Sequence, residues 1–275
     1  MTAAGSLRAA ISPCPNDIFI FGAWILGLVD GPGPARFTFA DVEELNQAAS
    51  QGRFEVIKVS AAAAGALQGD YEILSAGAAF GKGAGPKLVA RPGAPETPRS
   101  VAVPGLRTTA LALLRHALPH AFEAVPVVYD QVAEAVVQGR TDAGLLIHES
   151  ALVPERMGLE MRLDLGRWWD SLGTGAPLPL GVIMIRKDIA PTRRRAVEKS
   201  IRASLAMART DAGSIRPPIH ALIRAMAQEL DDATLQAHIE AYVDDLSMDM
   251  GRRGRTALDR LWDMDVRAPG GGAAG

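Results

Sequence analysis

A histidine stands at the end of an apolar run in the stretch AGLLIHESAL, where residues 143–147 give way to His148. Such a run is typical of a buried strand, so His148 is predicted at the carboxyl end of that strand. A histidine with an ordinary pKa of about 6.5 exchanges protons near neutral pH and can act as a general acid or base. Taken alone, His148 could equally be structural, and only its surroundings single it out.

Two other predicted strands also end in hydroxyl side chains. Ser60 follows the strand-like stretch FEVIKV and opens a helix of small residues, where it offers a hydroxyl, although a simple N-cap is an equal alternative. Thr108 and Thr109 follow VAVPGLR and open another helix, whose first N–H groups favour an anion. This segment lacks the lysine of a P-loop, so the pattern favours a carboxylate or a sugar hydroxyl over a polyphosphate.

The fourth polar strand end is the stretch SPCPND at residues 12–17. Its two prolines fix φ and preset the loop, and Asn16 or Asp17 is predicted to cap a helix that begins near Ile18. Cys14 would lie near that helix N-terminus, but no base beside it marks it as a nucleophile, and a small packing residue is the alternative. Because ligands bind outside the carboxyl ends of parallel strands, we expect the four loops to converge on one site around His148.

Strand-like runs alternate with Ala- and Leu-rich helical stretches through the first two thirds of the chain, and helical segments alone follow Pro191. This alternation predicts an α/β fold with parallel sheets and a helical C-terminal region. Two Pro/Gly-rich stretches, RPGAPETPR at 91–99 and GTGAPLP at 173–179, are interpreted as crossings between two lobes. Residues 1–93 and 181–275 are thus expected to form one lobe and residues 97–180 the other, with a ligand cleft between them.

Composition narrows the class of partner. The chain of 275 residues carries 29 Lys and Arg against 31 Asp and Glu, with no long block of either sign, so neither a nucleic acid nor a membrane is expected as a partner. Its one cysteine and the absence of a metal-ligand spacing of Cys and His indicate a reducing compartment and no metal site. The first residues lack the apolar segment of a signal peptide, so a cytoplasmic protein with a small-molecule carboxylate substrate is expected. The oligomeric state stays open.

The remaining histidines show no spacing to a partner and are interpreted as surface or helix-end residues; they are His116, His120, His220 and His238.

Eight motifs together carry a family resemblance: SPCPNDIFIF, DVEELN, KVSAAA, GKGAGPKLV, VPGLRTTA, GLLIHES, DLGRWWD and LPLG, in this order over roughly the first 190 positions. With them the chain resembles the 1,4-dihydroxy-6-naphthoate synthases of the futalosine route to menaquinone. The resemblance implies a two-lobe fold of the type II periplasmic-binding-protein kind. It also implies a lyase without a cofactor, which converts cyclic dehypoxanthine futalosine to 1,4-dihydroxy-6-naphthoate and dihydroxyacetone.

The same resemblance implies roles for individual residues. The catalytic histidine of the family corresponds to His148, and its substrate contacts correspond to Ser60, Thr108 and Thr109, with Asn46 of the DVEELN motif as a further candidate. Asn16 from the opening stretch completes the predicted set. The chain departs from the family at Ala61, where a tyrosine is common, and bulk is also missing at positions 62–65.

Two alternatives remain at this point. One is the chorismate dehydratase of the same pathway, which shares the fold but lacks the SPCPND-type opening. The other is a non-catalytic solute-binding protein, which would share the two lobes but normally carries an export signal or a lipid anchor.

Overall fold

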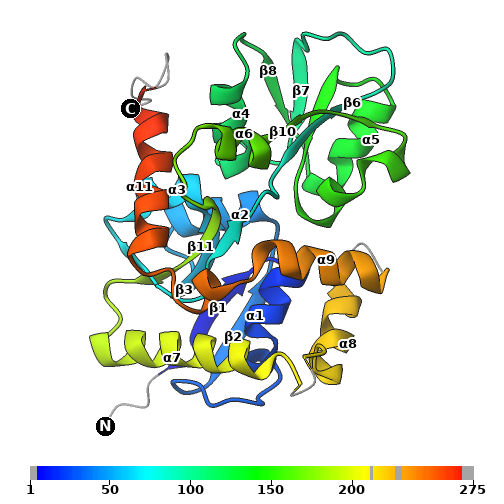
Figure 1. Cartoon of the computed structure of the whole chain (residues 1–275). Helices are drawn as coiled ribbons and strands as arrows, with labels where there is room; N and C mark the ends of the chain where they lie inside the picture. The colour runs from blue at the N-terminus through cyan, green and yellow to red at the C-terminus, as the bar shows by residue number, and fades with distance from the viewer. Residues whose placement is uncertain (1–4, 211–212, 227–230, 268–275) are drawn as a thin grey trace.

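The computed structural model describes residues 5–210, 213–226 and 231–267. Figure 1 shows two lobes, each built on its own β-sheet with helices packed around it. This agrees with the predicted α/β architecture of two lobes. The C-terminal helices surround the lobe that contains the N-terminus, as the sequence predicts.

The first sheet has six strands, ordered β2-β1-β3-β11-β4 with β5 paired to β11. Strand β1 runs parallel to β2 and β3, whereas β11 runs antiparallel to β3, β4 and β5. The strands are β1 (Leu7–Ile11), β2 (Ala35–Phe39), β3 (Val56–Ser60), β4 (Tyr71–Ile73), β5 (Ala79–Gly81) and β11 (Leu178–Arg186).

The second sheet has five strands in the order β10-β6-β9-β7-β8. Strand β7 is parallel to β8 and β9, and β6 is antiparallel to β9 and β10. The strands are β6 (Lys87–Ala90), β7 (Ser100–Val103), β8 (Glu123–Pro126), β9 (Ala143–Leu146) and β10 (Glu160–Asp164).

The helices begin directly after the strands in both lobes, and their first turns therefore lie at the strand ends. In the first part of the chain they are α1 (Pro15–Ile25), α2 (Val42–Ser50), α3 (Ala61–Leu67), α4 (Thr109–Ala117), α5 (Val132–Val137) and α6 (Leu165–Ser171). Three short 3-10 helices lie at η1 (Tyr129–Gln131), η2 (His148–Leu152) and η3 (Pro154–Met157). The C-terminal helices are α7 (Pro191–Met207), α8 (Pro217–Met226), α9 (Asp232–Tyr242), α10 (Asp245–Met248) and α11 (Gly251–Arg267).

The first predicted crossing between lobes lies elsewhere. Strand β6 pairs with β9 and β10, so it belongs to the second sheet, and the stretch 91–99 joins β6 to β7 within that sheet. The chain instead crosses at residues 82–86 and returns at 172–177, close to the second predicted crossing. Proline and glycine mark where a chain turns, but they do not tell which sheet the next strand joins.

Among the helical segments predicted after Pro191, helix α9 begins at Asp232. It ends at Tyr242, and a new helix begins after Asp244, whose side chain accepts from the N–H of Leu246 while Ser247 bonds back to the Asp244 N–H. This reciprocal capping box favours a fresh helix start over continuation. Helix α8 is described to Met226, and residues 227–230 lie outside the described part of the chain.

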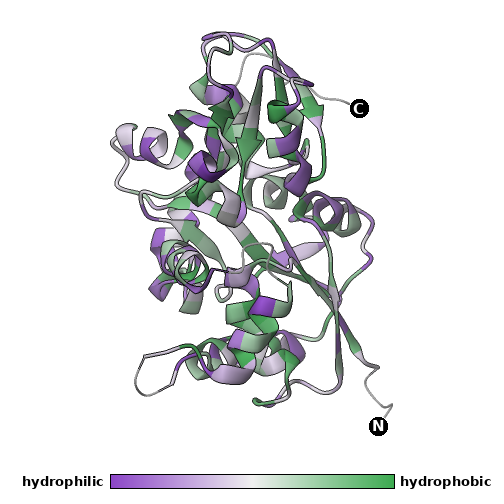
Figure 2. Cartoon of the chain, turned by 90° about the vertical axis from the view of Figure 1, so that its right-hand side faces the viewer, coloured by the Kyte–Doolittle hydropathy of each residue, from purple (hydrophilic) through white to green (hydrophobic). Residues whose placement is uncertain are grey.

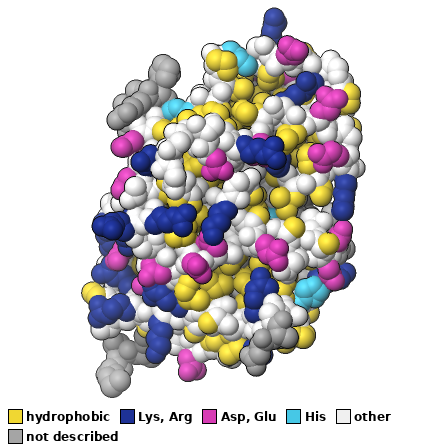
Figure 3. All heavy atoms as spheres, viewed as in Figure 1, with side chains coloured by type: hydrophobic (Ala, Val, Ile, Leu, Met, Phe, Trp, Pro, Cys, Tyr) yellow, Lys and Arg dark blue, Asp and Glu magenta, His cyan; other side chains and the backbone are white. Residues whose placement is uncertain are grey.

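One apolar cluster extends across both lobes, from β1, β3 and β11 of the first sheet to β6, β7 and β9 of the second. Strand β3 is buried at all five positions, and α1 is buried from Pro15 to Trp24 against the C-terminal helices. In Figure 2 the hydrophobic stretches run along the strands inside both lobes. Both signs of charge are spread over the face seen in Figure 3.

Candidate active site

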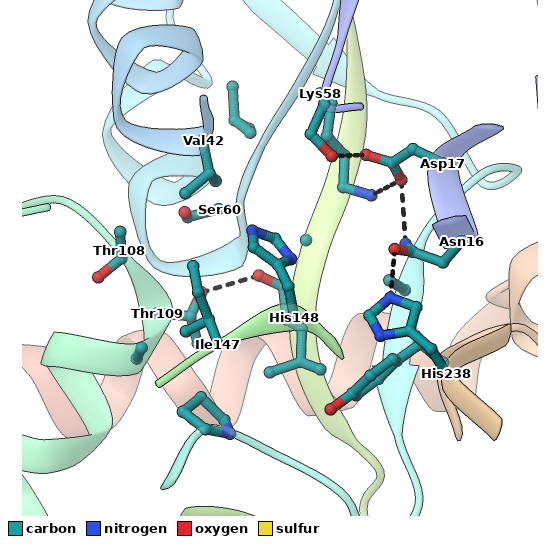
Figure 4. A pocket seen from close by; sticks show the side chains of 18 residues that line it. Asn16, Asp17, Val42, Lys58, Ser60, Thr108, Thr109, Ile147, His148 and His238 are labelled. Carbon is teal, nitrogen blue, oxygen red and sulfur yellow. Dashed lines mark hydrogen bonds and ion pairs between the residues drawn. The ribbon is translucent and has the colours of Figure 1, made fainter. Parts of the chain in front are cut away.

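A pocket lies between the lobes, where strand ends of both sheets meet (Figure 4). It encloses about 670 Å³, its open mouth included. Five of the six predicted site residues line it, namely Asn16, Ser60, Thr108, Thr109 and His148. The sixth, Asn46, lies behind Ser60 and is buried. The strand-end loops thus converge as the sequence predicts.

His148 is the first residue of η2, two positions after β9 ends. Its φ of 60° lies in the left-handed region, and no other described non-glycine residue has a positive φ. Non-glycine residues avoid this region unless the surroundings impose it, and such strain is concentrated at functional sites. The Tyr129 ring meets the imidazole edge-on, with centroids 5.0 Å apart. The imidazole is therefore fixed in direction at the pocket wall.

Cys14 differs from its prediction, because a base does lie beside it. Its Sγ is 3.1 Å from His148 Nδ1 and 3.4 Å from Nε2, although the two residues are 134 positions apart. The sequence could not give this contact, which joins the first lobe to the second. Cys14 is also the N-cap of α1, with Pro15 at the first helical position, so the helix begins three residues earlier than predicted and neither Asn16 nor Asp17 caps it. Proline is preorganised for that position, which explains the early start.

The two threonines at α4 have different duties. Thr108 caps the helix, since its Oγ1 accepts from the Leu111 N–H at 3.3 Å and donates to the Gly105 carbonyl at 3.1 Å. Thr109 Oγ1 donates to the Leu180 carbonyl at 3.0 Å and accepts from the Ala62 N–H at 3.1 Å, which joins the two lobes. Both hydroxyls are therefore already used by the protein.

The start of α4 nevertheless offers donors to an anion. A helix leaves its first N–H groups without an intrahelical acceptor, and Thr108 takes only that of Leu111. The N–H groups of Thr109 and Ala110 thus remain at the pocket wall, at the positive end of the helix dipole. At α3 the corresponding expectation is weaker, because Thr109 occupies the N–H of Ala62.

Ser60 is held by Asn46 through a pair of hydrogen bonds. The Asn46 amide donates to Ser60 Oγ at 3.0 Å, and its Oδ1 accepts from the Ser60 N–H at 2.9 Å. Ser60 makes no capping bond to α3, and because Asn46 donates to its Oγ, the hydroxyl proton remains available for another acceptor. Asn46 thus positions Ser60 and does not itself line this pocket, and its direct contact with the substrate stays a prediction.

A buried polar network forms the wall opposite Thr109, and most of it was missed from the sequence. Asp17 accepts from Lys58 Nζ, from Ser12 Oγ at 2.6 Å and from the Asn16 amide at 3.1 Å. Lys58 and Asp17 are only 5% and 1% exposed, so this is a fully desolvated ion pair. A lysine in the otherwise apolar strand VIKVS was the signal that could have revealed it.

A glycine makes room for this lysine. A Cβ on Gly181 would lie 2.6 Å from Lys58 Cε, so the lysine stem runs directly over the β11 backbone. Gly181, the last residue of the LPLG motif, therefore contributes to the pocket because the absence of a side chain leaves room for Lys58.

The interpretation of His238 as a surface or helix-end residue is wrong. It is 1% exposed, lines the pocket from α9, and its Nε2 lies 3.0 Å from Asn16 Oδ1. Tyr242, one turn further along α9, also lines the pocket and meets the His238 ring with centroids 4.8 Å apart. The spacing of four residues, which places both on one helix face, was the signal that could have found them.

Asp41 is an acidic residue near His148. It caps α2 by accepting from the Glu43 N–H at 2.8 Å. Burial raises the pKa of the Asp41 carboxyl above its ordinary value, against the lowering effects of that hydrogen bond and of the nearby His148. Asp41 therefore adds a partly desolvated carboxyl to the surroundings of the imidazole.

The small residues of α3 are covered from outside the pocket. Trp262 of α11 donates from Nε1 to the Ala61 carbonyl at 2.8 Å, and a Cβ on Gly65 would lie 3.1 Å from the Trp262 ring. Trp262 of the C-terminal helix therefore packs against Ala61 and Gly65 of α3.

The whole chain can now be compared with known proteins. The family model described as menaquinone biosynthesis matches residues 7–266, which is nearly every residue of both lobes. The chain belongs to this menaquinone-biosynthesis family.

Two curated relatives agree with that assignment. The chain is 42% identical to a 1,4-dihydroxy-6-naphtoate synthase of Thermus thermophilus over 94% of its own length and 93% of the relative. It is 35% identical to a protein of the same name from Streptomyces coelicolor, over 94% and 92% of the two chains.

Solved structures support the fold of this family member. Protein AF1704 from Archaeoglobus fulgidus superposes with a TM-score of 0.87 at 34% identity, covering 94% of this chain and 96% of the other. The alkanesulfonate-binding protein SsuA from Xanthomonas axonopodis pv. citri has a TM-score of 0.66 at 11% identity, covering 98% and 96%. At that identity the likeness concerns the fold alone, and it confirms the two-lobe fold of the periplasmic-binding-protein kind.

The described residues of this menaquinone-biosynthesis protein show neither a metal-binding cluster nor a membrane-spanning helix. Within them, no group of three or more His, Cys, Asp or Glu side chains is arranged to hold a metal ion. In the same part of the chain, no helix combines the length and the apolar character that crossing a bilayer requires.

Proposed function

We propose that this protein is a 1,4-dihydroxy-6-naphthoate synthase, a lyase that converts cyclic dehypoxanthine futalosine to 1,4-dihydroxy-6-naphthoate and dihydroxyacetone. Both curated relatives carry the name of this activity and align over more than nine tenths of the chain. The observation that carries the proposal is the position of His148, whose imidazole lies at the wall of the pocket between the lobes on a strained, left-handed backbone.

The pocket suits a substrate with a fused ring system and polar ends. Val42, Pro86 and Leu180 supply apolar surface on which rings can pack. The free N–H groups of Thr109 and Ala110 supply donors for the carboxylate that the naphthoate product retains. Ser60, positioned by Asn46, offers a further donor.

His148 takes a hydroxyl or carbon-bound proton from the substrate and starts the ring opening that releases the sugar-derived fragment. One imidazole that exchanges protons near neutral pH is enough for a step that removes and returns a proton, so the proposed mechanism uses no cofactor. The contacts of Thr109 with Ala62 and Leu180 hold the lobes together and limit the access of water.

A cytoplasmic location is part of the same proposal. The one cysteine of the sequence, Cys14, is a buried thiol that is not part of a disulfide, which agrees with a reducing compartment.

The test is turnover of cyclic dehypoxanthine futalosine by the purified protein, followed by the absorbance of the aromatic product and by identification of dihydroxyacetone. Conversion without added metal or cofactor supports the proposal. Binding without conversion would instead favour a solute-binding protein, and loss of water from chorismate in a parallel reaction would favour the dehydratase.

A further inference from the structure

The pocket contains a second imidazole, which the proposed mechanism does not use. His238 comes from α9, the helix that packs on α1 of the first lobe and also reaches η2 of the second lobe. Figure 4 shows its ring on the same pocket as His148, linked to Asn16. It is buried to 1% exposure, so its polar atoms need partners inside the protein or in a bound ligand.

The buried network around Asp17 sets the proton on this ring. Asp17 is a carboxylate paired with Lys58, so the group of Asn16 that faces it must be the amide NH₂. The carbonyl Oδ1 of Asn16 therefore faces His238, and an acceptor there requires a proton on His238 Nε2. The chain of bonds leaves Nδ1 as an unprotonated nitrogen with a lone pair.

That lone pair meets no donor among the described residues. Nδ1 of His238 is buried, and no donor in the described part of the chain reaches it. Burial, with the nearby charges of His148 and Lys58, keeps the pKa of His238 well below 6.5, so the ring is neutral at physiological pH. A buried acceptor without a hydrogen bond costs free energy. A ligand that donates a hydrogen bond to it would remove this cost.

We propose that His238 Nδ1 accepts a hydrogen bond from a hydroxyl of the sugar-derived end of the substrate, which makes His238 a substrate-binding residue. A lone pair repels a carboxylate, so the carboxylate belongs at the N–H groups of Thr109 and Ala110, and the hydroxyl belongs at His238. The pocket thus offers hydrogen-bond donors at the start of α4 and an acceptor at His238. This difference orients the substrate relative to His148. This inference rests on the proposed function, since it assigns a part of that substrate.

Two substitutions separate the Nδ1 acceptor from the network behind it. In His238→Gln the side-chain amide can still donate to Asn16, but nothing replaces Nδ1. In His238→Asn the amide oxygen takes the place of Nδ1, but the donor to Asn16 is lost. We expect kcat/KM for cyclic dehypoxanthine futalosine to fall by roughly 10- to 100-fold in His238→Gln, mainly through KM, and by less in His238→Asn. Thermal unfolding should show the opposite order, with His238→Asn the less stable.

A direct binding measurement accompanies the kinetics. In a His148→Asn background, titration calorimetry with cyclic dehypoxanthine futalosine should give a weaker affinity when His238→Gln is added. If the wild-type enzyme turns over the substrate and His238→Gln keeps its kcat/KM, or if the two His238 variants lose kcat/KM equally, the inference is overturned while the proposed function stands. If the wild-type enzyme gives no turnover, the proposed function fails first.

Discussion

The Cys14 sulfur lies 3.1 Å from His148 Nδ1 and so connects the cap of the first helix of one lobe to the proposed base of the other. The contact exists only while the lobes are together, because its two partners come from different sheets. It closes one side of the pocket and, with the Tyr129 ring, surrounds the imidazole. The position of the imidazole therefore depends in part on the contact between the two lobes.

Replacing His148 by asparagine should remove turnover and spare the fold. Asparagine tolerates the left-handed backbone at φ 60°, so no added strain is expected, whereas alanine at the same position adds about 1 kcal/mol. Loss of the proton acceptor should lower kcat by roughly 10² to 10⁴. The measurement is kcat on cyclic dehypoxanthine futalosine beside a thermal melt. His220→Asn, at a surface ion pair with Asp232, serves as the control and should keep its kcat. A His148→Asn enzyme with near-normal kcat would refute the assignment.

Removing only one partner of the buried ion pair between Lys58 and Asp17 should lower the free energy of unfolding more than replacing both partners by neutral side chains. Lys58→Met leaves Asp17 as an uncompensated buried charge, which should cost about 3 to 5 kcal/mol of the free energy of unfolding. The double variant Lys58→Met with Asp17→Asn should recover part of this loss, because no buried charge remains. Urea unfolding of the wild type, of the single variants Lys58→Met and Asp17→Asn, and of the double variant measures both effects.

A surface pair provides the matched comparison. Lys82 pairs with Asp244 at 2.8 Å, but its side chain is 57% exposed. Lys82→Met should change the free energy of unfolding far less than Lys58→Met. Equal losses from the two substitutions would show that Asp17 does not keep its charge in the folded protein.

The strand ends were predictable because the sequence repeats one pattern, an apolar strand followed by a helix. Apolar runs followed by polar, helix-starting residues place Ser60, Thr108 and His148 at carboxyl strand ends, and the sheets bring them to one pocket. The pocket residues that were not predicted from the sequence do not all follow this pattern. His238 lies in the middle of a helix with no strand before it, and only its spacing to Tyr242 marks a shared face.

Other features depend on contacts that local sequence does not contain. The side chain beside Cys14 is 134 residues away, so no reading of SPCPND alone can find it. Strand β6 was assigned to the wrong lobe for a similar reason, since its pairing with β9 and β10 is decided by partners at 143–146 and 160–164. Turn chemistry is local, whereas the choice of sheet is not.

Thr109→Val should weaken the join between the lobes. The substitution keeps the shape of the side chain but leaves the Ala62 N–H and the Leu180 carbonyl without the hydroxyl that now serves both. We expect a loss of about 1 to 3 kcal/mol in the free energy of unfolding and a higher KM, because the closed arrangement is less favoured. Thr109→Ser retains the hydroxyl and should stay near the wild type in both measurements. Similar losses from valine and serine would assign the effect to packing.

The buried His238 should make the protein acid-sensitive. Burial, helped by the charges of His148 and Lys58, keeps the folded-state pKa of His238 well below 6.5, whereas the unfolded chain titrates near that ordinary value. Between the two pKa values the unfolded state binds a proton that the folded state does not, so stability falls as the pH drops below about 6.5, by up to about 1.4 kcal/mol per pH unit. Glutamine does not titrate, so His238→Gln should lose less stability than the wild type between pH 7.5 and pH 5.5 in urea unfolding. His220→Gln, which removes a partly exposed histidine outside the pocket, is the matched control substitution. Parallel curves for the wild type and His238→Gln would mean that His238 takes up its proton in the folded protein at ordinary pH.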